Sequence, residues 1–247
     1  MSSVAKATQQ LHKAIIDGAP VLVIKAIKDG ADVRAFRVDG YSPLAFVDNT
    51  LILRLLLDAG ADPNHAPEDC APDILYWAAS AGRLEIVKML VAAGASVEPE
   101  RLDYGQDPFD WTSSVHAAAE RGDMEILTCL LSAGGKSVLN CFDYVSRTPL
   151  MIAVERGDLK MTQLLIETGS DVNAVDEVKI GNPAIRYAAE NQGLEMIKLL
   201  LDAGADPSIK GWMWLTAIDK ARDRKDDLGP QIVKSLESAA NRISHRS

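Results

Sequence analysis

The chain has few cysteines and few aromatic residues for its length of 247 residues. Its three cysteines, Cys70, Cys129 and Cys141, are an odd number without zinc-type spacing, so we expect neither a disulfide framework nor a cysteine metal site. Aromatic residues make up 5% of the sequence, which predicts a core built from leucine, alanine, isoleucine and valine. Reduced cysteines suit the cytosol, and the first residues lack the apolar segment of a secretory signal. We therefore expect a cytoplasmic protein.

Positive charge is also in short supply. The formal net charge is −9, with 26 basic and 35 acidic residues. This balance argues against a general binder of nucleic acids or of anionic membranes. No apolar run approaches the ~18 residues that a membrane-spanning helix needs. If charge contributes to recognition, we expect the partner to be basic.

Sequence motifs for catalysis and cofactor binding are missing. The chain has neither GxxxxGK[ST] nor a GxGxxG after a predicted strand, the two common phosphate-binding loops. Its four histidines, His12, His65, His116 and His245, are far apart in the chain. The acidic pairs fall at predicted helix ends and turns, where capping or solvation explains them. We therefore predict no enzyme, no metal and no cofactor.

Internal repetition is the feature that the sequence does have, and residues 142–173 show it best. A polar turn leads to Thr148-Pro149, with threonine as helix N-cap and proline in the first turn. Gly157-Asp158 ends that helix and begins a second apolar helix. Gly169 follows the second helix and is expected to adopt the left-handed conformation of a C-cap. Two helices this short cannot bury their apolar faces alone, so copies must pack on either side.

Copies of this stretch are marked by the glycine that ends each second helix. The intervals between successive glycines are 30, 34, 40, 35 and 35 residues, which indicates a repeat near 33 residues with insertions and one deletion. The marker glycines are Gly30, Gly60, Gly94, Gly134, Gly169 and Gly204.

The repeat resembles that of the ankyrin-repeat family. The family pattern is approximately Thr-Pro-Leu-His-x-Ala-Ala-x-x-Gly, then Glu-Ile-Val-x-x-Leu-Leu, then Gly-Ala-Asp-Val-Asn. The best match is carried by Thr148-Pro149-Leu150, Gly157, Leu164-Leu165 and Asp171-Val172-Asn173. Nearly the whole chain follows the pattern. His12 and His116 take the family's histidine position, where the ring usually bonds backbone between repeats.

The resemblance implies an all-α solenoid of stacked helix-turn-helix repeats, with turn fingers between repeats and caps at both ends. We expect one domain over 1–247. Its repeats would span about 8–35, 36–65, 66–98, 99–139, 140–173 and 174–208, with a C-terminal cap at 209–240. The second repeat lacks roughly three residues between its helices.

In this family, partner proteins bind the turn tips and the concave surface of the first helices. Carried over to this chain, those positions predict a protein-binding surface in the third to sixth repeats. The residues are Glu120, Arg121, Tyr144, Arg147, Glu155, Arg156, Glu190 and Asn191. The spacing stacks Arg121 beside Arg156, and Glu120 beside Glu155 and Glu190. An arginine pair suits a carboxylate-bearing partner, whereas the alternative is a solvated face of compensating charges.

Two aromatic segments stand outside the repeat pattern. The insertion at 99–111 combines aromatic and acidic residues, and its Tyr104 and Phe109 are predicted partner contacts. The alternative is a loop folded back on its neighbouring repeat. Trp212 and Trp214 lie in the last turn. We expect them to cap the open end of the stack, with a ligand platform as the alternative.

The resulting hypothesis is a non-catalytic protein-binding module, a scaffold, adaptor or inhibitor, that acts as a monomer. A bacterial effector or a toxin-neutralising immunity protein is the alternative, and an enzyme or small-ligand binder is the third reading. Neighbouring genes would separate the first two. The sequence does not name the partner, because such a surface is a scaffold for variable residues.

Overall fold

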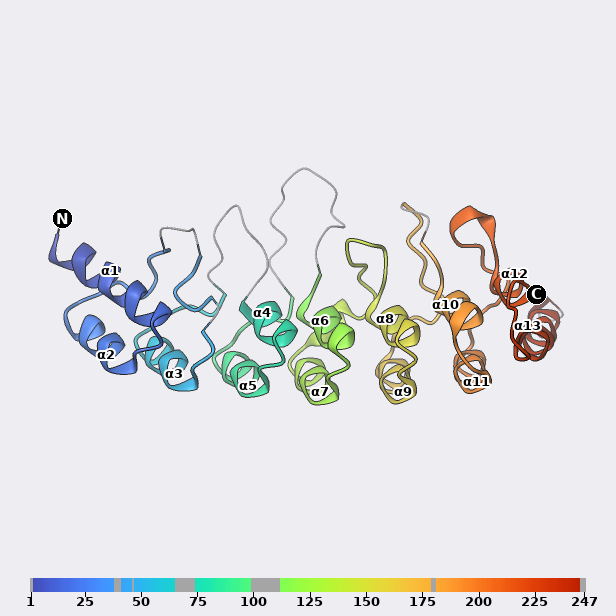
Figure 1. The fold of residues 1–247 in the computed structure, drawn as a ribbon, viewed down its shortest axis with the longest axis horizontal. Coiled ribbons are helices and arrows are strands. Elements are labelled where there is room, and N and C mark those ends of the chain that lie inside the picture. The colour runs from blue at the N-terminus through green and yellow to red at the C-terminus, as the bar shows by residue number, and fades with distance from the viewer. Residues whose placement is uncertain are drawn as a thin grey trace.

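The computed structural model describes residues 2–37, 41–45, 47–64, 74–98, 112–178 and 181–244. Within these ranges the structure is helical and contains no strand. Pairs of antiparallel helices stand side by side along one axis, and the described loops between the pairs project to one edge, which is uppermost in Figure 1. The two described ends of the chain lie at opposite ends of the array (Figure 1). The expected all-α ankyrin-type solenoid is confirmed.

Each regular repeat contributes a first helix and a second helix. The N-terminal pair is α1 (Ser3–Ile16) and α2 (Pro20–Lys28). The central pairs are α4 (Ile74–Ser80) with α5 (Leu84–Ala92), α6 (Ser114–Arg121) with α7 (Met124–Ser132), and α8 (Pro149–Glu155) with α9 (Leu159–Thr168). The C-terminal pairs are α10 (Ala184–Asn191) with α11 (Leu194–Asp202), and α12 (Ala217–Arg222) with α13 (Gly229–Ser244). Two 3₁₀ turns, η1 (Gly135–Val138) and η2 (Trp212–Trp214), lie in connections.

The second repeat departs from the helix pair. Its second helix is α3 (Thr50–Asp58), but the residues described before it, 41–45 and 47–49, form only a turn. The missing residues leave too little chain for a first helix and its turn. Leu44 still packs fully into the core. Among the described residues the deletion therefore leaves no first helix in this repeat, but the apolar contact between neighbouring repeats is kept.

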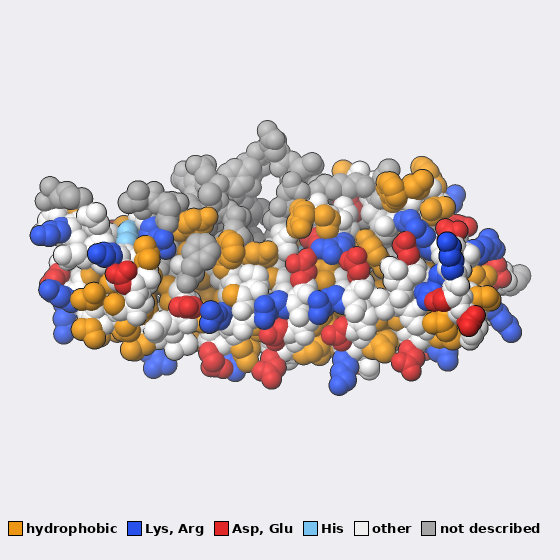
Figure 2. Space-filling view, viewed as in Figure 1, with side chains coloured by type: hydrophobic (Ala, Val, Ile, Leu, Met, Phe, Trp, Pro, Cys, Tyr) orange, Lys and Arg blue, Asp and Glu red, His pale blue; other side chains and the backbone are white. Residues whose placement is uncertain are grey.

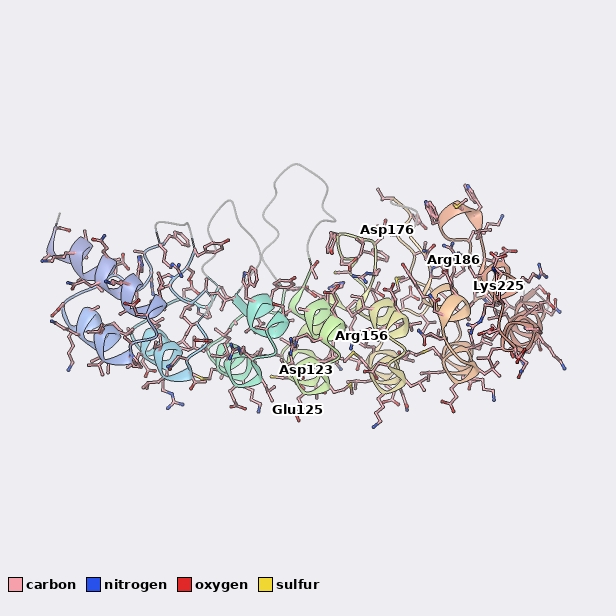
Figure 3. The ribbon with its side chains drawn as sticks, viewed as in Figure 1. Asp123, Glu125, Arg156, Asp176, Arg186 and Lys225 are labelled. Carbon is pink, nitrogen blue, oxygen red and sulfur yellow. The ribbon has the colours of Figure 1, made fainter. Side chains whose placement is uncertain are left out.

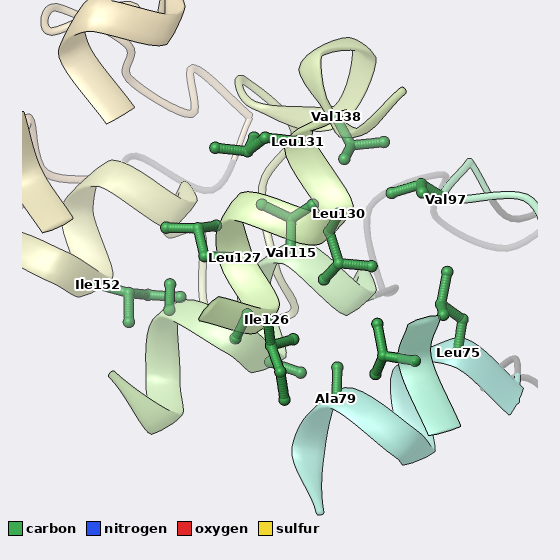
Figure 4. Close-up of a cluster of buried hydrophobic side chains, with 14 of the residues drawn as sticks. Leu75, Ala79, Val97, Val115, Ile126, Leu127, Leu130, Leu131, Val138 and Ile152 are labelled. Atoms are coloured by element: carbon green, nitrogen blue, oxygen red, sulfur yellow. The ribbon is translucent and has the colours of Figure 1, made fainter. Parts of the chain in front are cut away.

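The core runs through the array as a continuous layer between first and second helices. First helices pack in series, α4 on α6, α6 on α8, α8 on α10 and α10 on α12. Second helices α2, α3, α5 and α7 pack in the same way. Figure 4 shows one section, in which Leu75, Val115, Leu127 and Leu130 are fully buried between two neighbouring repeats. Since each repeat contacts chiefly its neighbours, stability depends on the interfaces between repeats.

The turns between repeats are fixed by backbone geometry and polar side chains. All six marker glycines have a positive φ, between 85° and 110°, as the left-handed C-cap requires. Asn173 Nδ2 donates to the Gly204 carbonyl at 3.0 Å, and Asn173 Oδ1 accepts from the Asp206 N–H at 2.8 Å. Asn64 makes the same pair of bonds to Gly94 and Ser96. These asparagines fix the register of one repeat on the next.

The predicted role of the two pattern histidines is confirmed. His12 Nε2 lies 3.0 Å from the Ala35 carbonyl of the following turn. His116 Nε2 lies 3.1 Å from the Cys141 carbonyl and 3.2 Å from the Arg147 carbonyl. Each ring therefore ties a first helix to the next finger.

Candidate interaction surface

The loops between repeats form the fingers of this array. We name three by their described residues, the 141–147 finger, the 174–178 finger and the 211–215 finger. They precede α8, α10 and α12 respectively. The predicted contacts Tyr104 and Phe109 lie outside the described residues. The other predicted residues lie on the 141–147 finger or at the ends of α6, α8 and α10.

Arg147 is the centre of a charge cluster that joins two repeats. Its Nε and Nη2 donate to Asp143 Oδ2 at 3.1 and 2.9 Å. Nη2 also donates to Glu120 Oε1 at 2.7 Å, and Nη1 donates to Glu155 Oε2 at 3.0 Å. The structure thus brings Glu120 and Glu155 together, as the repeat spacing predicts, and places Arg147 between them.

The electrostatics of this cluster follow from the burial of Asp143. Its carboxylate is fully buried and also accepts the backbone N–H groups of Val145 and Arg147. Burial disfavours the charged guanidinium of Arg147. Asp143 and Glu155 outweigh burial, so the pKa of Arg147 rises above its ordinary value. The cluster is therefore a fixed part of the finger.

Arg121 and Arg156 turn toward backbone carbonyls of the preceding repeat. Arg121 Nη1 donates to the Ser80 carbonyl at 3.1 Å. Arg156 donates to the carbonyls of Glu120 and Arg121 at 2.6 and 3.3 Å. The carbonyls at the end of a helix lack intrahelical partners, and a cation there is favourable.

The same contact recurs toward the C-terminus, where Gln192 Nε2 donates to the Glu155 carbonyl at 3.0 Å. Arg224 Nη1 donates to the carbonyls of Ala189 and Gln192 at 3.2 and 2.8 Å. Figure 2 shows basic side chains spaced across the middle of this face. These contacts support the alternative that the arginines belong to a solvated face with compensated charges. Partner binding by Arg121 and Arg156 stays a prediction. The sequence signal for the contact is the Arg-Gly pair repeated after 35 residues, at Arg121-Gly122 and Arg156-Gly157.

Replacing Arg156 with alanine is expected to lower the free energy of unfolding by about 1 kcal/mol, because two helix-end carbonyls lose a charged donor at a partly exposed site. Urea unfolding followed by circular dichroism measures the change. Lys160→Ala on α9 is the matched control, since this exposed lysine has no hydrogen bond or ion pair within the described part of the chain. Equal stability of the two variants would contradict the capping role.

The remaining predicted residues lie at the C-terminal half of the surface. Lys220 Nζ donates to Glu190 Oε1 at 3.0 Å. Like Glu120 and Glu155, this glutamate is therefore paired with a basic side chain. Asn191 is exposed at the end of α10. Three successive first helices thus each present one partly exposed glutamate toward the surface beside the fingers.

Apolar side chains protrude from the finger tips. Tyr144 is 59% exposed and Val145 is 47% exposed, although both are large and apolar or aromatic. Trp212, Met213 and Trp214 form η2 and are more than half exposed. The prediction that Trp212 and Trp214 cap the open end of the stack is wrong. Helices α12 and α13 cover that end, and η2 lies at the edge formed by the fingers (Figure 1).

Other classes of site have little support in the described part of the chain. No group of three or more His, Cys, Asp or Glu residues there is placed to hold a metal ion. None of the helices searched there is long and apolar enough to cross a bilayer. A hollow of about 470 Å³ lies between α5 and α7, on the side away from the fingers. Its lining combines the apolar Leu84 and Met124 with the ionisable Lys88, Glu125 and Cys129, and Lys88 is paired with Glu85.

Comparison with known proteins identifies the repeats. A family model described as "Ankyrin repeats (3 copies)" matches residues 44–136 and 115–211. Among solved structures, the human ASB11 ankyrin repeat domain is similar, with a TM-score of 0.70 and 22% sequence identity. That similarity covers 93% of this chain and 96% of the other. No curated protein matches the sequence.

Proposed function

The chain belongs to the ankyrin-repeat family, and we propose that it is a non-catalytic module that binds one partner protein through its C-terminal fingers and first helices. Ankyrin repeats generally mediate protein–protein interaction. In this proposal the protein is a monomeric cytoplasmic scaffold, adaptor or inhibitor. The net charge of −9 favours a partner that is basic as a whole.

The observation that carries the proposal is the exposed apolar edge beside a row of acids. Tyr144 and Val145 project from a finger whose base is held rigidly by the Arg147 cluster. Exposed aromatic residues on a rigid support are typical of interface anchors. Glu120 and Glu155 bond Arg147 at the base of this finger, and Glu190 has the corresponding position on α10. This arrangement suits a basic partner with apolar anchor residues.

The test is affinity capture with the double variant Tyr144→Ala/Val145→Ser. Immobilised protein is incubated with a lysate of the cells that make it, and captured proteins are quantified by mass spectrometry. We expect the main partner to be retained by wild type and reduced at least about tenfold by the variant, since loss of one hot-spot anchor costs on the order of 2 kcal/mol. Both side chains are exposed, so the fold should be unchanged.

The matched control is Val21→Ser/Leu22→Ser on α2. This pair removes a similar amount of exposed apolar surface at the other end of the array, because Val21 is 77% exposed and Leu22 is 51% exposed. Capture should remain at the wild-type level. Absence of any protein above a blank matrix, or an equal loss with both variants, would contradict the proposed function.

A further inference from the structure

Arg186 is a buried cation, and two of its three nitrogens lack a hydrogen-bond partner among the described residues. It is the third residue of α10 and is 2% exposed. Its Nε and Nη1 are buried and make no hydrogen bond within the described ranges. Figure 3 shows Arg186 near the finger end of α10, close to the segment that bears η2. Buried polar groups are normally paired, and an unpaired buried charge is more costly still, so this group requires a reason.

The two preceding first helices, α6 and α8, have an uncharged side chain at the position of Arg186. His116, Met151 and Arg186 follow each other at intervals of 35 residues, and each is the third residue of its helix. His116 Nδ1 bonds the N-cap Ser113, and Met151 Sδ accepts from the N-cap Thr148. The N-cap of α10 is Pro183, which offers no side-chain partner. Arginine here therefore lacks the bond that the other two residues make.

The finger opposite Arg186 also lacks the acid found in the two preceding fingers. Asp143 and Asp176 are both buried, and each accepts the N–H of the residue two positions later. Gly211 has the corresponding position in the 211–215 finger. Its N–H donates to the Leu215 carbonyl, as the Asp143 N–H donates to the Arg147 carbonyl. A Cβ on Gly211 would lie 2.9 Å from Arg186 Nη1. The guanidinium thus lies against bare backbone where the preceding fingers carry a carboxylate.

Nearby acids do not compensate for this missing carboxylate. Glu190, one turn along α10, is already bound by Lys220. Burial lowers the pKa of Arg186 from its ordinary value, and Glu190 offsets this only in part. Arginine nevertheless stays charged near neutral pH. A carboxylate supplied from outside the chain would find an unpaired N–H donor of a charged guanidinium at Nε or at Nη1.

The finger that covers Arg186 is strained and weakly held. Met213 and Trp214 both have φ near +60°, which is unfavourable for residues with bulky side chains. None of the three residues of η2 is buried. Its two backbone bonds, Gly211 N–H to the Leu215 carbonyl and Trp214 N–H to the Gly211 carbonyl, lie within the finger, and the Trp212 N–H donates to Asn182 Oδ1 at 2.9 Å. Backbone strain of this kind is typical of functional sites.

We propose that Arg186 and the 211–215 finger form a binding site for an acidic side chain of the partner protein, with Trp212, Met213 and Trp214 receiving the apolar residues beside it. This inference rests on the proposed function and adds one local feature of the partner, which can be basic elsewhere. The finger moves off α10 as the carboxylate binds, and the bound acid replaces the missing finger aspartate.

The experiment uses an array of immobilised hexapeptides with amidated C-termini. One central position is Glu, Asp, Gln or Asn, and the flanking positions sample Leu, Ile, Phe and Trp. Wild-type protein is expected to prefer the acidic peptides over their amide counterparts by at least about tenfold, as a charge-assisted bond to a buried cation implies. Arg186→Met, which introduces the residue that α8 has at this position, is expected to abolish that preference. Its midpoint of thermal unfolding should be equal to or above that of wild type, because an unpaired charge is removed.

Lys210→Met is the matched control, since Lys210 Nζ lies 5.9 Å from the Trp214 ring centre and is an exposed cation of the same turn. It should keep the acid preference. An equal loss with Lys210→Met, an unchanged preference with Arg186→Met, or a lower unfolding midpoint of Arg186→Met would overturn the inference. So would the absence of any binding by wild type. If the peptides fail while Tyr144→Ala/Val145→Ser still abolishes capture from lysate, the inference is overturned and the proposed function stands.

Discussion

Replacing Arg147 with methionine is expected to lower the free energy of unfolding by about 3 kcal/mol, because it leaves a buried carboxylate without its counter-charge. Asp143 is fully buried and receives two of the four side-chain hydrogen bonds of Arg147. After the substitution, the Asp143 carboxylate keeps only the hydrogen bonds from the backbone N–H groups of Val145 and residue 147. Urea unfolding followed by circular dichroism measures the loss.

Two exposed acids of the same cluster provide the controls. Glu120 and Glu155 have side chains that are 41% and 45% exposed, whereas that of Arg147 is 18% exposed. Glu120→Gln and Glu155→Gln should each change stability by less than about 1 kcal/mol, as exposed ion pairs do. The double variant Asp143→Asn/Arg147→Met should recover part of the loss, because it removes the orphaned charge. If Arg147→Met is no worse than Glu120→Gln, the cluster does not hold the finger.

The elements that sequence alone could predict are those set by local backbone chemistry. Gly169 and its five counterparts adopt positive φ because a helix followed by a turn requires it. Thr148-Pro149 begins α8, and His116 bonds the next finger, as the pattern implies. These features depend on residues that are close in sequence or one repeat length apart, so the spacing of residues in the sequence is enough to predict them.

The direction of long polar side chains could not be predicted in this way. The spacing does place Arg121 and Arg156 in neighbouring repeats, but only the structure shows that each turns back to the preceding helix end. Glu120 and Glu155 share Arg147 because the finger folds over α6, which is a tertiary contact. Long side chains have many rotamers, and neighbouring carbonyls and carboxylates decide among them.

The last turn was mispredicted for a different reason. Trp212 and Trp214 have the composition of a hydrophobic cap, but α13 already fills that role with the buried Ile232, Leu236 and Ala239. The pattern also gave no sign that Arg186 lacks a partner, because that depends on Pro183 and Gly211 in two different segments. Both features depart from the repeat, and such departures are where functional residues are expected.

Acidification is expected to destabilise the array by about 3 kcal/mol through His116 alone, between about pH 6.5 and pH 4. His116 is fully buried, and its Nδ1 accepts from the Ser113 N–H while Nε2 faces the carbonyls of Cys141 and Arg147. These partners fix a neutral ring with its proton on Nε2. Burial lowers its pKa to about 4, although Asp143 favours the charged form. In this window the unfolded chain binds a proton that the folded chain does not, so stability rises with pH and is lost as pH falls.

The variant His116→Met isolates this effect, since Met151 occupies the same place in the next repeat. At pH 7 it should be less stable than wild type by on the order of 1–2 kcal/mol, having lost the bonds to the finger carbonyls. Between pH 6.5 and 4 its stability should fall by about 3 kcal/mol less than that of wild type, because every other ionisable group is the same in both proteins. Urea unfolding at half-unit intervals of pH measures both curves. Parallel curves would mean that His116 takes up its proton without disturbing the fold. The ring would then not be held neutral between α6 and the 141–147 finger.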